Sequence, residues 1–169
     1  MAAATLFGIN TVACSSCHGT NPVSNSHLNS TVDFAAGDVG QALLGERTAL
    51  AVERASYWMK LYPERFYLEL HRTGREGDES HLHAAVKLAQ ALQCPVVATN
   101  DVRFLTANEF EAHEARVCIR EGRTLDDPRR ARHYTEQQYL RSPQDMAELF
   151  ADIPEALANS VEIARRCNV

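Results

Sequence analysis

Two short apolar segments, separated by one helical segment, constrain the fold of this chain more than any other feature. Residues 65–70 (RFYLEL) are rich in aromatic and apolar side chains and precede a turn-rich loop, which is typical of a β-strand. Residues 95–99 (PVVAT) form a short apolar run that predicts a buried strand. The stretch 79–93 between them has its apolar residues on one helical face: Leu82, Val86, Ala89 and Leu92. Strands that alternate with such helices imply parallel strands with helices packed outside, so the sequence predicts an α/β fold.

Helices are expected on both sides of this strand–helix–strand unit. Four stretches resemble helix starts, at residues 38–41, 106–109, 142–143 and 152–155. Gly45 is an expected break in the first helical stretch, Pro63 ends that stretch, and Gly122 can end the second. No strand is predicted between the last two helices, so a helical extension is expected there. Because two strands cannot close a sheet, the chain is either a small α/β piece or part of a larger sheet.

Charge divides the chain into units. Residues 1–32 contain no lysine, arginine, aspartate or glutamate, although the whole chain of 169 residues carries a net charge of −5. We expect residues 1–34 to be an uncharged leader that is disordered or foreign to the rest, 35–123 to be the α/β unit, and 124–169 to be the helical extension. The acidic balance argues against a free-standing nucleic-acid binder. No apolar run is long enough for a membrane span, and the five cysteines form no disulfide framework, which favours the cytoplasm.

Polar residues follow each predicted strand, at the positions where α/β proteins bind ligands. The first strand is followed by His71, Arg72 and Thr73, and the second by Asn100, Asp101, Val102 and Arg103. Asp101 is the strongest single candidate, because a carboxylate just past a buried strand can bind a metal ion. The alternative is a purely local role, in which Asn100 and Asp101 form a turn through their own backbone hydrogen bonds.

A long collinear run of motifs resembles a known family. The motifs are GDVGQALLGE at 37–46, YLELHRTGR at 67–75, HAAVKLAQAL at 83–92, PVVATNDVRF at 95–104, EAHEARVCIREGRTLDDPRR at 111–130, YTEQQYLRS at 134–142 and DIPEALANSVEIARRCNV at 152–169. They resemble the later part of the PHP (polymerase and histidinol phosphatase) domain at the start of the alpha subunit of bacterial DNA polymerase III. The resemblance implies a partial distorted (β/α) barrel of PHP type with a C-terminal helical extension.

The resemblance also implies a degenerate metal site. In this family a metal cluster draws on an early His-x-His, a histidine after the first strand and an Asp-x-His after the second. The early pair is not found in this sequence, the second position is Thr73, and the final pair reads Asp101-x-Arg103. Arginine carries a permanent positive charge and cannot ligate a cation. We therefore expect no catalytic residue and no bound cofactor, with divalent metal at Asp101 disfavoured. The guanidinium of Arg103 is expected to replace the cation and pair with Asp101.

Such a degenerate domain is implied to be a structural platform within a DNA-directed DNA polymerase, a nucleotidyltransferase of DNA replication. The expected partners are the remaining domains of the alpha subunit and the separate proofreading exonuclease subunit, and DNA only through the full-length parent. The palm aspartates needed for polymerisation lie downstream in this family. The chain is therefore expected to be a cytoplasmic fragment that does not polymerise by itself.

Two other functions remain open at this point. Cys14, Cys17 and His18 form a C-x-x-C-H motif, which is the attachment pattern of c-type haem in an electron carrier. An active PHP phosphoesterase or 3′-5′ exonuclease that uses metal at Asp101 is the second alternative, disfavoured by Thr73 and Arg103.

Overall fold

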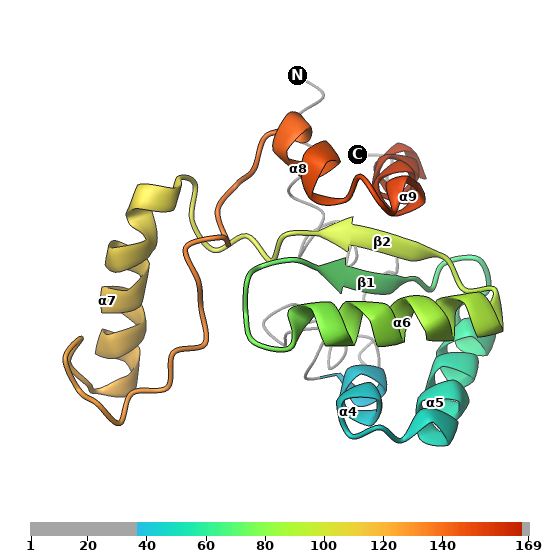
Figure 1. The fold of residues 1–169 in the computed structure, drawn as a ribbon, viewed down its shortest axis with the longest axis horizontal. Coiled ribbons are helices and arrows are strands. Elements are labelled where there is room, and N and C mark those ends of the chain that lie inside the picture. Colours follow the sequence, from blue (N-terminus) through green and yellow to red (C-terminus); the bar gives the residue numbers. More distant parts are fainter. Residues whose placement is uncertain (1–36, 167–169) are drawn as a thin grey trace.

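The computed structural model describes residues 37–166, which form a small parallel sheet surrounded by helices (Figure 1). In chain order the elements are α4 (Asp38–Leu44), α5 (Thr48–Leu61), β1 (Leu68–His71), α6 (Asp78–Leu92), β2 (Val96–Thr99), the 3₁₀ helix η3 (Ala107–Glu109), α7 (Phe110–Glu121), α8 (Pro143–Leu149) and α9 (Pro154–Arg166). The mixed α/β class predicted from the sequence is confirmed. The haem motif at Cys14, Cys17 and His18 lies outside the described residues.

The sheet of the described region consists of β1 and β2 in parallel, with Leu68 opposite Val96 and His71 opposite Thr99. The second strand is found within the predicted run 95–99 and begins one residue later, at Val96. The first begins three residues later than predicted and extends one residue further, to His71. Pairing starts where the Leu68 amide donates to the Pro95 carbonyl, because β2 itself begins only after Pro95. The preceding aromatic residues therefore have no β2 residue opposite them, whatever their strand propensity.

The core lies between the sheet and helices from both ends of the chain. Leu68 and Leu70 of β1 are fully buried against helix residues such as Leu82 of α6. Met146, Phe150 and other residues of the C-terminal helices belong to the same cluster. α9 therefore packs against β2, which leads to the candidate site, and α8 packs against α9.

Helix α9 covers the outer edge of β2. The side chain of Asn159 donates to the Val96 carbonyl (2.8 Å), and the Ser160 hydroxyl donates to the Ala98 carbonyl (2.9 Å). In a parallel pair alternate residues direct their backbone groups to opposite sides, so these carbonyls face away from β1. Side chains of α9 thus donate hydrogen bonds to backbone carbonyls that the outer edge of β2 would otherwise expose.

Several helix boundaries follow local signals, and one expected capping box is absent. Ser142 caps α8 by accepting from the Asp145 amide, with Pro143 in the first turn, and Gly122 ends α7 at φ 65°. The helix start predicted with Asp38 as a capping residue is wrong, because Gly37 occupies the N-cap position of α4 and has no side chain. The Asp38 carboxylate instead accepts from the indole N–H of Trp58 in α5 (3.1 Å).

No helix among residues 37–166 is long and apolar enough to cross a membrane.

Candidate functional site at the strand ends

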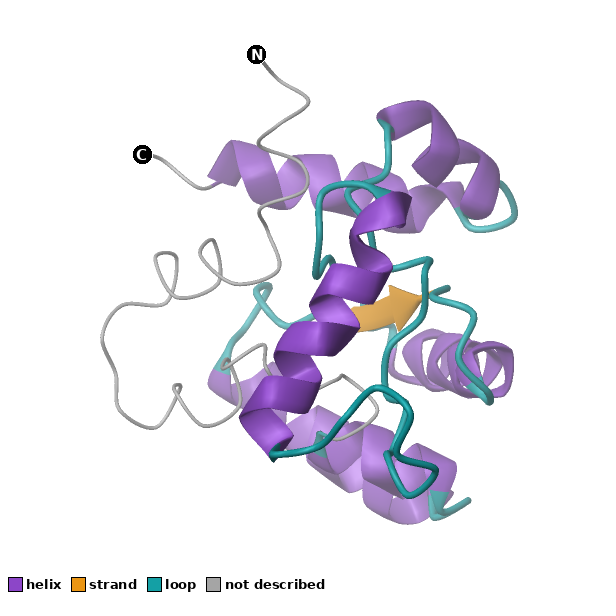
Figure 2. Cartoon of the chain, turned by 90° about the vertical axis from the view of Figure 1, so that its left-hand side faces the viewer, coloured by secondary structure: helices purple, strands orange, loops and turns teal. Residues whose placement is uncertain are grey.

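The loops that leave β1 and β2 emerge at the same end of the sheet. Figure 1 shows both arrows pointing to the side from which the chain continues towards α6 and α7, and Figure 2 shows α7 standing in front of that end. Thr73 follows β1 by two residues and Asp101 follows β2 by two residues. Parallel pairing therefore places the two sequence-predicted positions at the same edge, as expected.

Asp101 lies at the centre of this edge and is 95% buried. Its Oδ1 is 2.7 Å from the guanidinium of Arg103, as the sequence predicted. Its Oδ2 lies 3.3 Å from the guanidinium of Arg75 and accepts from the side-chain amide of Gln138 at 2.7 Å. Both carboxylate oxygens are thus occupied by donors from three side chains. The backbone of Asp101 has a φ of 42°, a conformation that aspartate tolerates better than most residues.

Thr73 is connected to the same group of side chains. It is fully buried, and its hydroxyl donates to Oδ2 of Asp78 at 2.8 Å while accepting from Nε of Arg75 at 2.9 Å. Asp78 is the first residue of α6 and also accepts from the Thr73 amide. Arg75 therefore lies between the two predicted positions, linking the exit of β1 to the exit of β2.

A distant segment completes the site. Residues 137–140 run beside residues 100–104, with the Arg103 amide donating to the Gln138 carbonyl (2.8 Å) and the Leu140 amide to the Phe104 carbonyl (3.0 Å). The Asn100 side chain donates to the carbonyls of Gln137 (2.9 Å) and Tyr139 (2.7 Å). These contacts of Asn100 fasten the returning segment to the strand end, which goes beyond the local turn considered from the sequence.

We call the four charged side chains Asp78, Asp101, Arg75 and Arg103 the strand-end cluster. It contains two carboxylates and two guanidiniums, so its formal charges balance without a cation. Its residues do not fit a metal site, because arginine has no lone pair to donate to an ion. In the described part of the chain, no group of three or more histidine, cysteine, aspartate or glutamate side chains is arranged to hold a metal ion.

Sequence reasoning missed three members of this site. Arg75 and Asp78 lie in the turn-rich loop expected after the first strand and were given no role. Gln138 is 37 residues from Asp101, in the expected helical extension. The only available signal for Gln138 was its position within the YTEQQYLRS motif, which predicts no contact.

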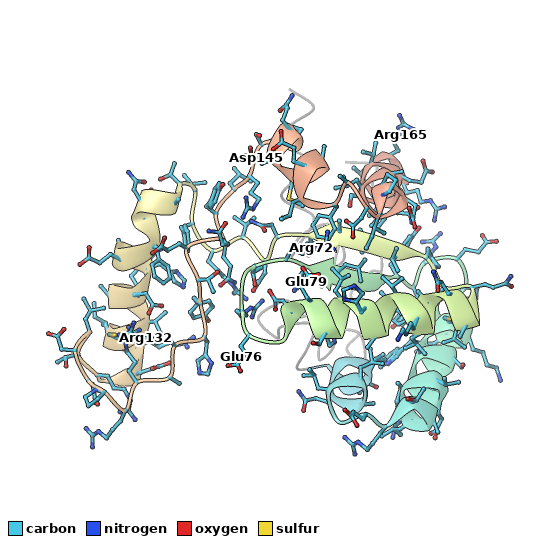
Figure 3. All side chains as sticks on the ribbon, in the orientation of Figure 1. Arg72, Glu76, Glu79, Arg132, Asp145 and Arg165 are labelled. Carbon is cyan, nitrogen blue, oxygen red and sulfur yellow. The ribbon has the colours of Figure 1, made fainter. Side chains whose placement is uncertain are left out.

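Arg72, a third residue after β1, makes a separate connection. Figure 3 places it beside Glu79 of α6, below the C-terminal helices. Its guanidinium binds both carboxylate oxygens of Asp152 (2.6 and 2.8 Å), Glu79 (2.9 Å) and the Leu149 carbonyl (2.6 Å). The hydrogen bonds from Arg72 lower the pKa of Asp152 to about 2, and the hydrogen bond to Asp152 raises the pKa of Arg72. Arg72 therefore fastens the C-terminal helices to β1 and α6 and takes no part in the strand-end cluster.

Comparison with known proteins identifies the relatives of this chain. No family model matches it. Over 133 residues, 79% of the chain, it is 62% identical to the DNA polymerase III subunit alpha of Pseudomonas aeruginosa and 60% identical to that of Escherichia coli K12. The subunit of Vibrio cholerae is 54% identical over 134 residues. The matched region makes up 11–12% of these relatives, so the chain corresponds to a small segment of the alpha subunit. The resemblance to this subunit predicted from the sequence motifs is confirmed.

Proposed function

We propose that this chain is the later part of a PHP-type domain in the alpha subunit of a bacterial DNA polymerase III, and that it acts there as a structural platform. In this proposal residues 35–123 belong to a distorted α/β barrel whose other strands lie outside the described residues. Residues 124–169 lead towards the polymerase body. The burial of Met146 and Phe150 in the common core favours counting the C-terminal helices as part of the same packed body.

The strand-end cluster carries this proposal. Asp101 occupies the position of a family metal ligand, yet each of its oxygens accepts hydrogen bonds from a cation or an amide. A metal ion would have to displace Arg103 or Arg75 and remove that guanidinium's contact with the Asp101 carboxylate in a largely buried place. Uncompensated buried charges cost several kcal/mol, so the arrangement favours retention of the ion pairs over metal binding.

If this chain is a structural platform, the catalytic residues of the parent protein lie in its other parts. Nucleotidyl transfer would be performed by residues outside this chain, in a cytoplasmic replication enzyme. The partners proposed for this segment are the remaining domains of the alpha subunit and the proofreading exonuclease subunit, with DNA contacted only through the whole subunit. The chain's net charge of −5 is consistent with a segment that does not itself bind DNA.

Calorimetric titration with Mn²⁺ and with Zn²⁺ tests the degenerate site. We expect no saturable binding that depends on Asp101, so that the wild-type chain and the Asp101→Asn variant give the same heats. The exposed Asp126→Asn variant is the matched control for loss of one surface carboxylate. Tight binding of one ion that disappears only in Asp101→Asn would overturn the proposal.

Hydrolysis assays address the catalytic alternative. We expect neither a nitrophenyl phosphate nor a single-stranded oligonucleotide to be cleaved by the purified chain. Cleavage that is abolished by Asp101→Ala, in a variant that retains its circular dichroism spectrum, would establish an active phosphoesterase or exonuclease instead.

A further inference from the structure

Helix α7 is held in place mainly by the loop that follows it, residues 122–141. Figure 1 shows the helix set apart from the sheet, and besides η3 no helix or strand among residues 37–166 packs extensively against it. In the loop, the guanidinium of Arg130 pairs with the carboxylate of Glu114 on α7, and both side chains are buried. Because these contacts involve one loop and no strand, α7 can separate from the loop without unfolding the sheet.

His113 of α7 belongs to this interface. Its ring centroid is 4.7 Å from that of Tyr134 in the loop and 5.5 Å from that of Phe104, which follows β2. The Nε2 atom is shielded from solvent and has no hydrogen-bond partner within residues 37–166. A neutral imidazole leaves one uncharged nitrogen unpaired in this position, whereas an imidazolium would leave a charged N–H without an acceptor, which costs considerably more. The interface therefore favours the neutral form of His113.

The charged groups around His113 are mostly positive. Burial lowers the pKa of His113 from its usual 6.5, and the positive charges of Arg116 and Arg120 on α7 and of Arg103 after β2 lower it further. The negative charge of Glu114 opposes them, but this carboxylate is already paired with a guanidinium. Burial and the surrounding charges therefore favour the same protonation state.

Two other neighbours of the interface offer little to an imidazolium. The guanidinium of Arg103 lies over the Tyr134 ring, 5.4 Å from its centroid, so this ring already faces one cation. The carboxylate of Glu109 in η3 accepts hydrogen bonds from the amides of Leu105 and Thr106. Neither the aromatic ring nor this carboxylate is thus free to compensate a new positive charge on His113.

We propose that His113 is a pH-sensitive switch, and that protonation of its imidazole releases α7 from the loop that follows it. The release bears on the strand-end cluster, because the same loop carries Gln138, whose side-chain amide donates to Asp101 at 2.7 Å. Histidine suits such a switch, since its charge changes near neutral pH and small changes of environment move that transition. The proposal does not depend on the platform role of the chain.

The direction of the pH dependence follows from proton linkage. In the released form His113 is exposed and has its usual pKa of 6.5, whereas in the docked form its pKa is lower. The released form therefore binds more protons in the window below pH 6.5. Docking is most stable above the usual pKa and loses stability as the pH falls from there through the lower pKa of the docked form. Acidification to about pH 5 thus favours release of α7.

Titration of the His113 ring, followed by NMR on the full chain, is the first test. The midpoint is expected below the usual 6.5. Arg116→Gln, which removes an exposed positive charge, is expected to move the midpoint upwards without disturbing the fold.

Hydrogen exchange at about pH 7.5 and about pH 5 is the second test. After correction for intrinsic exchange rates, protection of the α7 amides is expected to fall at least about threefold at the lower pH. The amides of α5, a helix without histidine, are expected to keep their protection. His113→Phe retains an aromatic ring that cannot titrate and is expected to abolish the change. The matched control His133→Gln, at an exposed histidine of the loop, is expected to leave it intact.

Three results would overturn the proposal. One is a His113 midpoint at or above 6.5, because docking would then favour the charged imidazole. Another is α7 protection that does not depend on pH, or whose loss persists in His113→Phe, since a different group would then be responsible. The third is a parallel loss of protection in α5, which would indicate acid unfolding of the whole chain. The NMR titrations of the wild-type chain and of Arg116→Gln decide the matter even if His113→Phe does not fold.

Discussion

Replacement of Asp101 by asparagine tests whether the strand-end cluster stabilises the fold. The substitution preserves the size of the side chain but removes its charge. Three side-chain contacts change, with Arg103 at 2.7 Å, Arg75 at 3.3 Å and Gln138 at 2.7 Å. A hydrogen bond to a charged group contributes about 1.5–3 kcal/mol and a neutral one about 0.5–1.5, so each contact loses roughly 1 kcal/mol. We therefore expect Asp101→Asn to lower the free energy of unfolding by about 3 kcal/mol.

This value agrees with the lower end of the roughly 3–5 kcal/mol cost of breaking a buried ion pair. The lower end is appropriate because the side chains of Arg75 and Arg103 retain 18% and 19% exposure. An asparagine also presents one N–H₂ group to neighbours that are all donors, so at least one contact is lost outright.

Urea denaturation followed by circular dichroism at pH 7 measures the effect. The exposed Asp126→Asn variant, which removes one carboxylate from a loop, is expected to change stability by less than about 0.5 kcal/mol. The double variant Asp101→Leu, Arg103→Met removes the buried carboxylate together with the guanidinium that pairs with it. The Arg75 guanidinium still has the Asp78 carboxylate 3.9 Å away. This double variant is expected to be more stable than Asp101→Asn. A loss below about 1 kcal/mol in Asp101→Asn would refute the assignment of a stabilising role to the cluster.

Three further predictions concern the core, the C-terminal helices and a buried thiol. Phe150→Ala, at a fully buried position, is expected to cost about 3–5 kcal/mol, measured by thermal unfolding. Because the folded pKa of Asp152 is about 2 and its usual value is 3.8, its contribution is present above pH 4 and is lost as the pH falls towards 2. With the Asp152 side chain 58% exposed, we expect only about 1 kcal/mol, and the slope of stability against pH in that window should flatten in Asp152→Asn. Burial raises the pKa of the Cys94 thiol to about 11, so reaction with a disulfide reagent at pH 8 is expected to be far slower in the folded chain than in urea.

Local structure was largely predictable from the sequence because its causes are local. The cap at Ser142 and the C-terminal glycine at 122 act within one helical turn, and both lie where the sequence placed them. The β2 strand was predictable because a short, wholly apolar run has few alternatives in a soluble protein. The Asp101–Arg103 pair was predicted from the resemblance to the family, in which a histidine ligand stands where this chain has an arginine, and the two residues are close enough in sequence to meet.

Other features were decided only by the tertiary structure. The start of β1 depends on where β2 begins, and the Asp38 carboxylate binds Trp58 of another helix instead of capping its own. Gln138 reaches Asp101 across 37 residues, and Arg72 reaches Asp152 across 80. Contacts of this kind depend on how the helices pack around the sheet, and residue type alone does not specify which distant partner a buried polar group will meet. The sequence thus determined most of the elements and the Asp101 carboxylate at the end of β2, whereas packing determined which side chains surround that carboxylate.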